Sequence, residues 1–341
     1  MAQRDARQGT ILILALWALG LLTVLAVNIG IQVRQRIELV SRLERRADLS
    51  MMAAAGIEKA RAVIFREPEA GEKPLTPAEQ QLRWSDNPAA FGGIPFAAGT
   101  VDVRYDDYDP VHDQWVTRYG LVDEDRKINV NRAGREILAR LAAVVLGLDD
   151  DAADDLGTAI YDWREYGESE IEGFFSDEYY DQLEFPYPEK KLPYETIAEL
   201  RMVKGMTAAV YDRLEPYLTV YGSGQVNLNT APAPVLAALG FSSGWIDGVL
   251  SLRRGPDGIA MSTDDVIFDS PGALLANLGS FGTGEPEDSA VFAALSAQGL
   301  LGAQSMFYRV ESVARVRNAA EERRVVGIFS GQDGRLVYWQ E

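Results

Sequence analysis

The 341-residue chain contains no cysteine and a single histidine, His112. The missing thiols exclude disulfide bonds, thiolate metal sites and cysteine nucleophiles. One histidine excludes an HExxH zinc site and any cluster of histidine ligands. His112 follows Val111 in a polar turn with no nucleophile motif nearby, which indicates an ordinary surface residue. Because Walker and GxSxG motifs are also absent, the sequence predicts a protein that is not an enzyme.

Basic residues are scarce too: 33 Lys and Arg face 51 Asp and Glu, which gives a formal net charge of -18. Because phosphate binding needs a basic face, this balance argues against nucleic acid as a main partner. Residues 149–189 hold fifteen acidic residues and one basic residue, Arg164, so 14 of the net negative charges lie in this stretch. With 47% hydrophobic residues the chain still has enough apolar content to fold.

Charge is absent from residues 10–31, which read TILILALWALGLLTVLAVNIGI. A helix of these 22 residues rises about 33 Å, so we expect it to span a membrane. The preceding MAQRDARQG is a charged leader that ends in Gly9, unlike a secretory signal with its shorter apolar core. Two arginines precede the apolar run and five follow it within residues 34–46, so the positive-inside rule favours a cytoplasmic C-terminal side.

The helix is expected to continue beyond the membrane. From Gln32 to Phe65 there is no proline, and apolar residues recur at helical spacing. Glu67-Pro68 then ends the pattern. The sequence therefore predicts one helix of about 55 residues, roughly 80 Å long, whose second half packs on a globular domain.

The leader, the apolar run and its amphipathic continuation together resemble a type IV prepilin and the related type II secretion pseudopilins. This resemblance implies cleavage by a prepilin peptidase between Gly9 and Thr10, followed by methylation of Thr10. It also implies an inner-membrane anchor with a cytoplasmic leader and a periplasmic bulk, against the arginine count. The fifth residue after the cleavage point is Leu14, where most pilins carry Glu, and this departure resembles the minor pseudopilin K (GspK) family.

Strand patterns lie at both ends of the globular part, with turns at Asp109-Pro110, Asn318-Ala319 and 331–334. The strands would form an antiparallel sheet that covers the helix, a pilin-like α+β unit. Residues from about 127 to 302 interrupt this unit and are rich in helix signals. The expected strands are 101–105, 115–122, 307–316, 323–329 and 336–339.

The interrupting segment contains a repeat, since INVNRA at 128–133 matches VNLNTA at 226–231. Each copy reads as an asparagine-rich cap of an amphipathic helix, and the 98-residue offset indicates either a duplication or two similar caps. LRMVKGM at 200–206 looks like a helix-hairpin-helix turn, a unit that often holds DNA through backbone amides. Beside so acidic a stretch, a packing unit without DNA contact is the favoured interpretation.

These pieces resemble the helical insertion of the pseudopilin K family, in the family's order. The matching phrases are KINVN at 127–131, AIYDWRE at 159–165, ELRMVKGM at 199–206, PYLTVY at 216–221 and VNLNTAPAPVLAAL at 226–239. We therefore expect five parts: a prepilin leader at 1–9, the transmembrane half of the long helix at 10–33, the pseudopilin helix and first strands at 34–126, an inserted all-α domain with helix-hairpin-helix, SAM-like units at 127–302, and strands completing the sheet at 303–341.

The resemblance implies a minor pseudopilin at the tip of the type II secretion pseudopilus, which initiates and caps the fibre and supports export across the outer membrane. Expected partners are minor pseudopilins I and J, the major pseudopilin, the prepilin peptidase, the secretin and exported substrates, without nucleic acid. Two alternatives stay open. One is a pilin-like DNA-uptake or DNA-binding protein that uses the hairpin, and the other is an anchored periplasmic hydrolase.

Carboxylates are dense between residues 162 and 181, where they would repel one another without a cation. Ca²⁺ takes six to eight oxygen ligands from flexible loops, although this segment lacks the EF-hand pattern. The pseudopilin K family is known for calcium in its helical domain, near a Trp-plus-acid and an acid-acid-x-Tyr pattern. The candidate Ca²⁺ ligands by that match are Asp162, Glu165, Asp177 and Glu178, with Glu168 and Glu172 added for their proximity.

Overall fold

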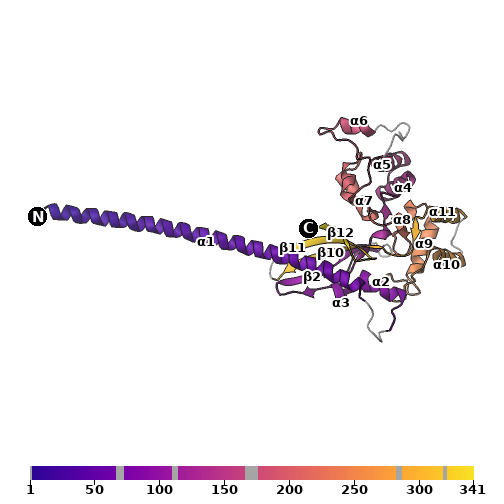
Figure 1. The fold of residues 1–341 in the computed structure, drawn as a ribbon, viewed down its shortest axis with the longest axis horizontal. Helices are drawn as coiled ribbons and strands as arrows, with labels where there is room; N and C mark the ends of the chain where they lie inside the picture. Colours follow the sequence, from indigo (N-terminus) through magenta and orange to yellow (C-terminus); the bar gives the residue numbers. More distant parts are fainter. Residues whose placement is uncertain (1, 67–72, 110–113, 166–175, 282–285, 318–320) are drawn as a thin grey trace.

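A computed structural model describes residues 2–66, 73–109, 114–165, 176–281, 286–317 and 321–341. Its first element is helix α1, Ala2–Ile64, which is 63 residues long and so rises about 94 Å. Figure 1 shows α1 as a single rod that projects from the globular part of the molecule, here called the head, and carries the N-terminus at its far end. The long N-terminal helix predicted from the sequence is confirmed, and it also takes in the leader.

One antiparallel sheet covers the last turns of α1. Its strands pair in the order β1-β2-β10-β11-β12, and β5 pairs with β10 beside β2. The predicted antiparallel sheet is therefore confirmed. The strands are β1 Ile94–Pro95, β2 Gly99–Val103, β5 Val122–Asp123, β10 Phe307–Val316, β11 Glu322–Ser330 and β12 Leu336–Gln340.

Helix and sheet meet along a face of small and aliphatic residues. Met52, Ala53, Ile57 and Ala60 of α1 are buried at helical spacing against β2, β10 and β11. Gly56 lies at the closest approach, because a Cβ built there would come within 2.8 Å of Val101 Cγ1. The sheet therefore packs directly on the backbone of α1.

Residues 115–122 do not form the single strand that the sequence predicts. Instead β3, Tyr105–Asp109, and β4, Gln114–Arg118, form a separate hairpin, and only β5 joins the main sheet. The break comes at Gly120, where a Cβ would lie within 2.6 Å of backbone atoms of Ser85. Chain 119–121 turns to pair with the end of α2 instead. The two helices that precede this hairpin are α2, Pro77–Ser85, and α3, Pro88–Phe91.

The insertion between β5 and β10 is mainly helical but not all-α, because two short parallel strand pairs, β6–β7 and β8–β9, run through it. Two residues per strand are too short to leave a periodic signal in the sequence. Its elements are η1 Glu124–Arg126, β6 Ile128–Asn129, α4 Arg135–Leu146, α5 Asp150–Asp162, α6 Ser176–Asp181, η2 Ile197–Met202, α7 Ala208–Leu214, η3 Glu215–Tyr217, β7 Leu218–Thr219, β8 Val226–Asn227, α8 Ala233–Ala238, α9 Ser243–Arg253, α10 Pro271–Phe281, α11 Pro286–Ala297 and β9 Leu301–Gly302.

The prediction that the asparagines of the sequence repeat cap the helices that follow them is wrong. The N-cap of α4 is Gly134, and the N-cap of α8 is Pro232. In the first copy, Asn131 instead bonds both the N–H and the C=O of Tyr194. In the second copy, the equivalent Asn229 bonds both backbone groups of Phe268 in the same way. Each asparagine thus pins a distant segment of its own unit.

Arginine contacts follow the same repeat. Arg164 donates to the carbonyls of Val130 and Ala133, and Arg253 donates to the carbonyls of Leu228 and Ala231. These four acceptors are equivalent at the 98-residue offset of the repeat. The two copies also share the parallel strand pairs that close them. The repeat therefore extends from sequence to hydrogen bonding, and we name the copies unit 1, residues 128–219, and unit 2, residues 226–302.

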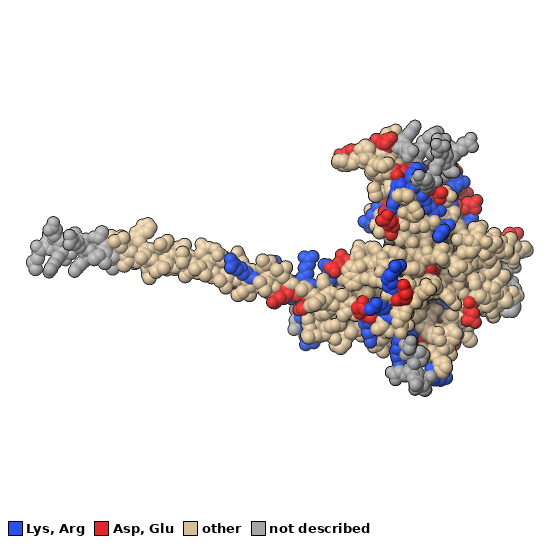
Figure 2. Space-filling model, in the orientation of Figure 1, with Lys and Arg blue, Asp and Glu red and all other residues tan. Residues whose placement is uncertain are grey.

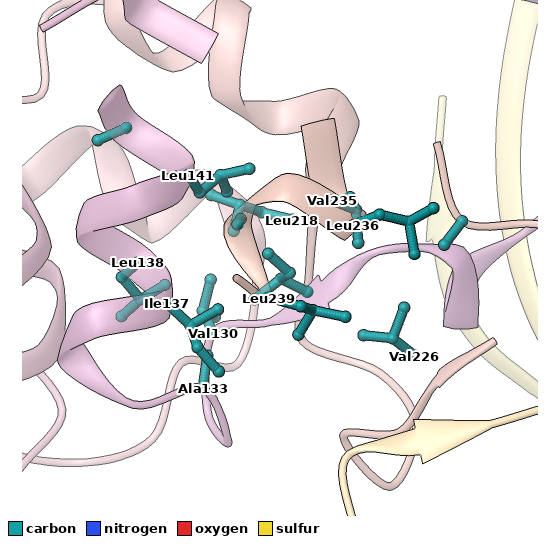
Figure 3. Packing of buried hydrophobic residues seen from close by; sticks show 14 of the residues in the cluster. Val130, Ala133, Ile137, Leu138, Leu141, Leu218, Val226, Val235, Leu236 and Leu239 are labelled. Carbon is teal, nitrogen blue, oxygen red and sulfur yellow. The ribbon is translucent and has the colours of Figure 1, made fainter. Parts of the chain in front are cut away.

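The two units share one hydrophobic core. Figure 3 shows Leu138 and Leu141 of α4 and Leu236 and Leu239 from α8 and its end as members of one cluster, and all four are buried. Helices α4 and α8 are in direct contact. Because buried residues of both units belong to one cluster, we expect the insertion to unfold as a single body.

Buried acidic residues join this body to the sheet. Asp123 accepts hydrogen bonds from Asn227 and Thr230 of unit 2. Asp125 accepts from the backbone N–H groups of Met306 and Phe307, where β10 begins. Burial, helped by the nearby Asp123, raises the pKa of the Asp125 carboxyl to about 7. The end of β5 is thus tied to the start of unit 2, and the start of the inserted segment is tied to the start of β10.

Candidate functional site

The exposed surface of α1 is the first functional feature. In the described part of the chain this is the one helix long and apolar enough to cross a membrane. Leu14 and Trp17 are 66% and 76% exposed, so no part of the head covers this stretch. Figure 2 shows an uncharged stretch of α1 between the grey N-terminal residues and the first charged side chains, which lie nearer the head. Gly9 and Thr10 lie within α1, but their side chains are outside the described set.

The predicted metal ligands are only partly placed. Asp162 closes α5 and is buried, and Glu165 is half-exposed, with its carboxylate 3.6 Å from Nε of Arg164. Asp177 and Glu178 lie in α6, without described side chains. Two further candidates, Glu168 and Glu172, lie outside the described residues, and so does His112, which the sequence indicates to be an ordinary surface residue.

Asp162 meets a carboxylate that the sequence did not single out. Lys191 Nζ is 3.5 Å from Oδ2 of Asp162 and is also ion-paired with Glu189. Asp162 and Glu189 are each only 7% exposed. Glu189 could not be singled out from the sequence, because it reaches Asp162 only where the chain returns to α5 nearly thirty residues later. No local sequence pattern indicates such a return. The structure therefore brings two buried carboxylates to the end of α5.

The returning chain is held in place by backbone and aromatic contacts. Lys191 N–H donates to the carbonyl of Trp163 at 2.9 Å. The Trp163 ring lies edge-on to Tyr180 and Tyr187, with ring centroids 5.4 and 6.2 Å away. These rings join the end of α5 to α6 and to the segment before Glu189, on the side where the acidic residues gather.

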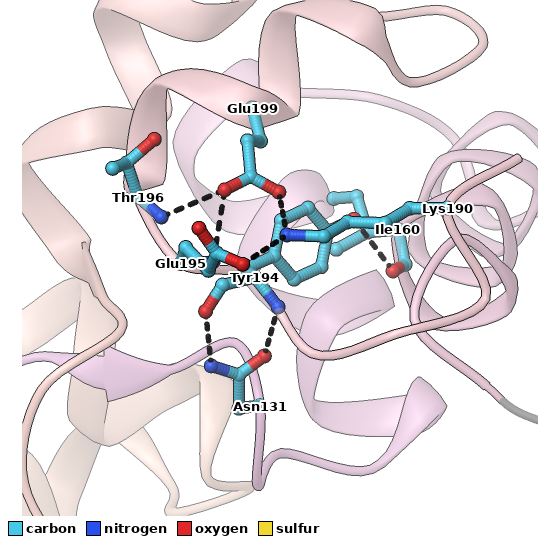
Figure 4. A network of polar contacts seen from close by, with 7 residues as sticks. All are labelled: Asn131, Ile160, Lys190, Tyr194, Glu195, Thr196 and Glu199. Carbon is cyan, nitrogen blue, oxygen red and sulfur yellow. Dashed lines mark hydrogen bonds and ion pairs between the residues drawn. The ribbon is translucent and has the colours of Figure 1, made fainter.

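A network of hydrogen bonds and ion pairs also holds the chain around Lys190 and Tyr194 (Figure 4). Tyr194 is bonded by Asn131, as described above, and its hydroxyl donates to the carbonyl of Ile160 at 2.9 Å. Lys190 donates to Glu199 at 2.7 Å, and the other oxygen of Glu199 accepts from the N–H of Thr196 at 2.9 Å. The positions of Glu189 and Lys191 are thus set by neighbours on both sides.

The donor set has the right chemistry for a hard cation, but the described part of it is incomplete. Carboxylate oxygens are the ligands that Ca²⁺ prefers, and it needs six to eight of them. Within the described residues no three acidic or histidine side chains are grouped so that they could hold a metal. Asp162 and Glu189 would supply two of the carboxylates.

The predicted helix-hairpin-helix does not take a regular form. Its first helix, η2, is a six-residue 3-10 helix, and Gly205 has a φ of +81° before α7 begins. The N–H of Lys204, in the turn, donates to the hydroxyl of Tyr180 at 2.9 Å. An amide used inside the fold is not available to a phosphate. No observation in the described structure therefore favours the DNA-binding alternative.

Two comparisons with known proteins bear on identity. Residues 119–223, which include unit 1, match the family model of the type II secretion system (T2SS), protein K. The chain carries a type II secretion protein K domain. Over 91% of its length it also resembles a chain of the crystal structure of the GspK-GspI-GspJ complex from enterotoxigenic Escherichia coli, with a TM-score of 0.57, 17% sequence identity and 98% of that chain covered. No curated protein matches it significantly.

The protein K domain confirms the family resemblance drawn from the sequence. Together with the shared fold it supports a minor-pseudopilin role. Protein K is a structural, non-enzymatic component of the secretion system, so the match to its family model bears out the prediction that the chain is not an enzyme. The apolar helix α1 is consistent with a protein that is anchored in a membrane.

Proposed function

We propose that this protein is the tip subunit of a type II secretion pseudopilus, anchored in the inner membrane with its head in the periplasm. The observation that carries the proposal is the combination, in one chain, of an exposed apolar helix, a sheet packed on its end and a protein K domain. A solved structure with this fold is a complex of GspK with GspI and GspJ. We therefore propose minor pseudopilins of the I and J types as its partners.

The shape of the molecule supports a capping role. In Figure 1 the insertion lies at the end of the head that faces away from the anchor. Subunits of such a fibre would pack through their long helices, and a body of this size above the sheet would block the next subunit. Leu14 also fits a subunit at the tip of the fibre. Most pilins carry Glu at this position, and a terminal subunit has no neighbour above it whose amino terminus needs that carboxylate.

Co-purification tests the assembly. The chain is co-expressed with the I and J pseudopilins of the same secretion system, and a tag on this chain is used to isolate it from detergent extracts. We expect both partners to be recovered together with it. Recovery of neither partner, while I and J still bind each other, would remove the tip role but leave the protein K domain in place.

Processing gives a sharper prediction. Co-expression with an active prepilin peptidase should remove residues 1–9, and a Gly9→Val change should abolish the cleavage. The expected loss is nearly complete, because the peptidase reads the glycine next to the scissile bond. The intact mass of the membrane-extracted protein measures this cleavage. It also reports methylation of Thr10, which adds about 14 Da, the mass of one CH₂ group.

The matched control is Gly20→Val, in the apolar run, where a Cβ meets nothing within 4 Å. This variant should be cut as the wild type is. An uncut wild-type chain beside an active peptidase would contradict the pseudopilin orientation, and the arginine count would then favour a cytoplasmic head.

We also propose that the acidic end of α5 binds Ca²⁺ through Asp162, Glu189 and carboxylates of the following segment. When bound, the ion would neutralise carboxylates that otherwise repel one another. Lys191 fills part of this role between Asp162 and Glu189 in the structure, so a bound ion would compete with its ammonium group. The residues of the Lys190 network would keep the returning chain in place.

Calcium removal should therefore lower stability. At a Ca²⁺ concentration a hundred times its Kd, binding stabilises the folded state by about 2.7 kcal/mol, which raises Tm by roughly 5–11 °C for a body of this size. Differential scanning calorimetry with calcium, magnesium or chelator measures this shift. Asp162→Asn should lose most of it, while Asp212→Asn, on the exposed side of α7, should keep it. A wild-type Tm that does not respond to calcium would refute the site.

A further inference from the structure

Arginines gather on α1 directly after its uncharged run. Residues 32–46 hold five arginines and two acidic residues, so this segment has a net charge of +3 in a chain whose net charge is -18. In Figure 2 the first charged side chains beyond the uncharged stretch of α1 are basic. Three of the five arginines, Arg34, Arg36 and Arg42, are exposed and nearest to the uncharged run, and we name them the arginine collar.

Two members of the collar have no acidic partner. Within the described residues, the side chains of Arg36 and Arg42 make neither an ion pair nor a hydrogen bond. Arg34 Nε lies 3.2 Å from Glu38, but these side chains are 84% and 54% exposed, so the pair contributes little. Arg45, by contrast, is ion-paired with the head. The collar therefore presents guanidinium groups that the fold itself does not use.

The collar lies at the depth of the lipid headgroups. With residues 10–31 in the hydrocarbon core, Arg34 and Arg36 follow the edge of the core by about 4.5 and 7.5 Å along the helix axis. Because the headgroup layer on each side of a bilayer is roughly 5–8 Å thick, both side chains reach its phosphates. Arg42 lies about 16 Å from the same edge, where its charge still acts on the surface over a Debye length of about 8–10 Å.

The directions of the side chains favour lipid over a partner helix. Successive residues of an α-helix are rotated by about 100°, so Arg34 and Arg36 point to opposite sides of α1. One neighbouring helix can cover only one of these sides, whereas lipid headgroups surround the helix. Figure 1 shows α5 and α6, in the acidic stretch 149–189, at the other end of the molecule. The carboxylates of these helices are therefore too far away to neutralise the collar.

We propose that the arginine collar binds the phosphate groups of anionic phospholipids at the membrane surface nearest the head. A guanidinium fork matches a phosphate with paired N–H donors, and a basic segment beside a membrane span is attracted to anionic lipid. The inference rests on the membrane anchoring in the proposed function, but not on the tip role. It also gives a reason for arginines on a side where, in the proposed orientation, the positive-inside rule disfavours them.

Electron paramagnetic resonance of spin-labelled lipids tests the proposal. The full chain is reconstituted in phosphatidylcholine vesicles that contain a trace of either spin-labelled phosphatidylglycerol or spin-labelled phosphatidylcholine. The fraction of label whose motion is restricted at the protein surface gives the relative affinity of the protein for each lipid. The collar variant combines Arg34→Gln, Arg36→Gln and Arg42→Gln.

The matched control combines Arg61→Gln, Arg132→Gln and Arg335→Gln. These three arginines are exposed, and they lie at the end of α1 and in the head, away from the membrane span. The control removes as much positive charge as the collar variant does, so it separates the position of the arginines from the net charge of the protein. The leader is the same in all three proteins, so its two arginines cannot account for a difference.

We expect the wild type to prefer phosphatidylglycerol over phosphatidylcholine about fivefold, the effect of one arginine near the membrane surface. The preference should fall as salt rises. The collar variant should lose most of the preference, while the control should keep it. An equal preference in the collar variant, or no preference in the wild type at low salt, would overturn the proposal.

Two further outcomes separate this proposal from the proposed function. If the wild type restricted neither labelled lipid, α1 would not enter the bilayer, and both the membrane anchoring and the lipid contact would be refuted. If the collar variant kept the lipid preference but no longer recovered the I and J pseudopilins in the co-purification, the collar would belong to an interface with a partner helix. That result would overturn the lipid contact and leave the tip role in place.

Discussion

Replacing Gly56 by leucine should detach the sheet from α1. The Cβ alone would come within 2.8 Å of Val101 Cγ1 and 3.1 Å of Ser312 Cβ, and both atoms belong to central strands that cannot move independently. Overpacking of this kind costs about 3 kcal/mol or more, which corresponds to a fall in Tm of roughly 6–12 °C. Thermal unfolding of the full chain in detergent, followed by near-UV circular dichroism, measures the change.

The matched control is Gly279→Leu, since Gly279 is also a helical glycine but a Cβ there meets nothing within 4 Å. It should leave Tm almost unchanged. Ser312 allows a second check, because its buried hydroxyl has no hydrogen-bond partner among the described residues. Ser312→Ala should therefore be tolerated alone and should reduce the cost of Gly56→Ala. Equal Tm values for the two leucine variants would mean that α1 does not dock as the structure shows.

The parts of the fold that could be predicted are those with long periodic patterns. The uncharged run at 10–31 and the helical spacing after it identify α1, and long runs rich in apolar residues, bounded by turn residues, identify β10 and β11. The misread strand at 115–122 fails for a tertiary reason. Gly120 turns the chain because its backbone packs against α2, a contact between segments more than thirty residues apart that no window of sequence contains.

The insertion shows the same limit in its polar residues. The repeated asparagines were visible in the sequence, but they were read as local helix caps because that is their commonest short-range use. Asn131 and Asn229 instead bond backbone groups 63 and 39 residues away. Glu189 was not singled out for the same reason, whereas Asp162 was proposed as a ligand because a family pattern surrounds it. The sequence therefore shows which polar residues recur, but not the distant backbone groups or carboxylates that they meet in the fold.

The repeated arginine contacts lead to the second large effect. Arg253→Met should destabilise unit 2 strongly, because it leaves the carbonyls of Leu228 and Ala231 without their donor. Both residues are buried, and an unsatisfied buried group costs about 1–3 kcal/mol, so the pair costs roughly 2–6 kcal/mol. Burial, helped by the neighbouring Arg126 and Arg254, lowers the pKa of Arg253 to about 9.

Arg164→Met is the equivalent change in unit 1. The neutral comparison is Arg254→Met, because only the backbone N–H of Arg254, which donates to Leu252, has a hydrogen bond among the described residues. Limited proteolysis with mass analysis distinguishes the units, since Arg253→Met should expose cleavage sites first in unit 2 and Arg164→Met first in unit 1. Because α4 and α8 share one core, the second unit should follow soon after the first. If each variant instead opened only its own unit, the insertion would consist of two independent bodies. If neither lowered Tm by more than Arg254→Met does, the shared arginine contacts would be a by-product of the repeat rather than what holds it closed.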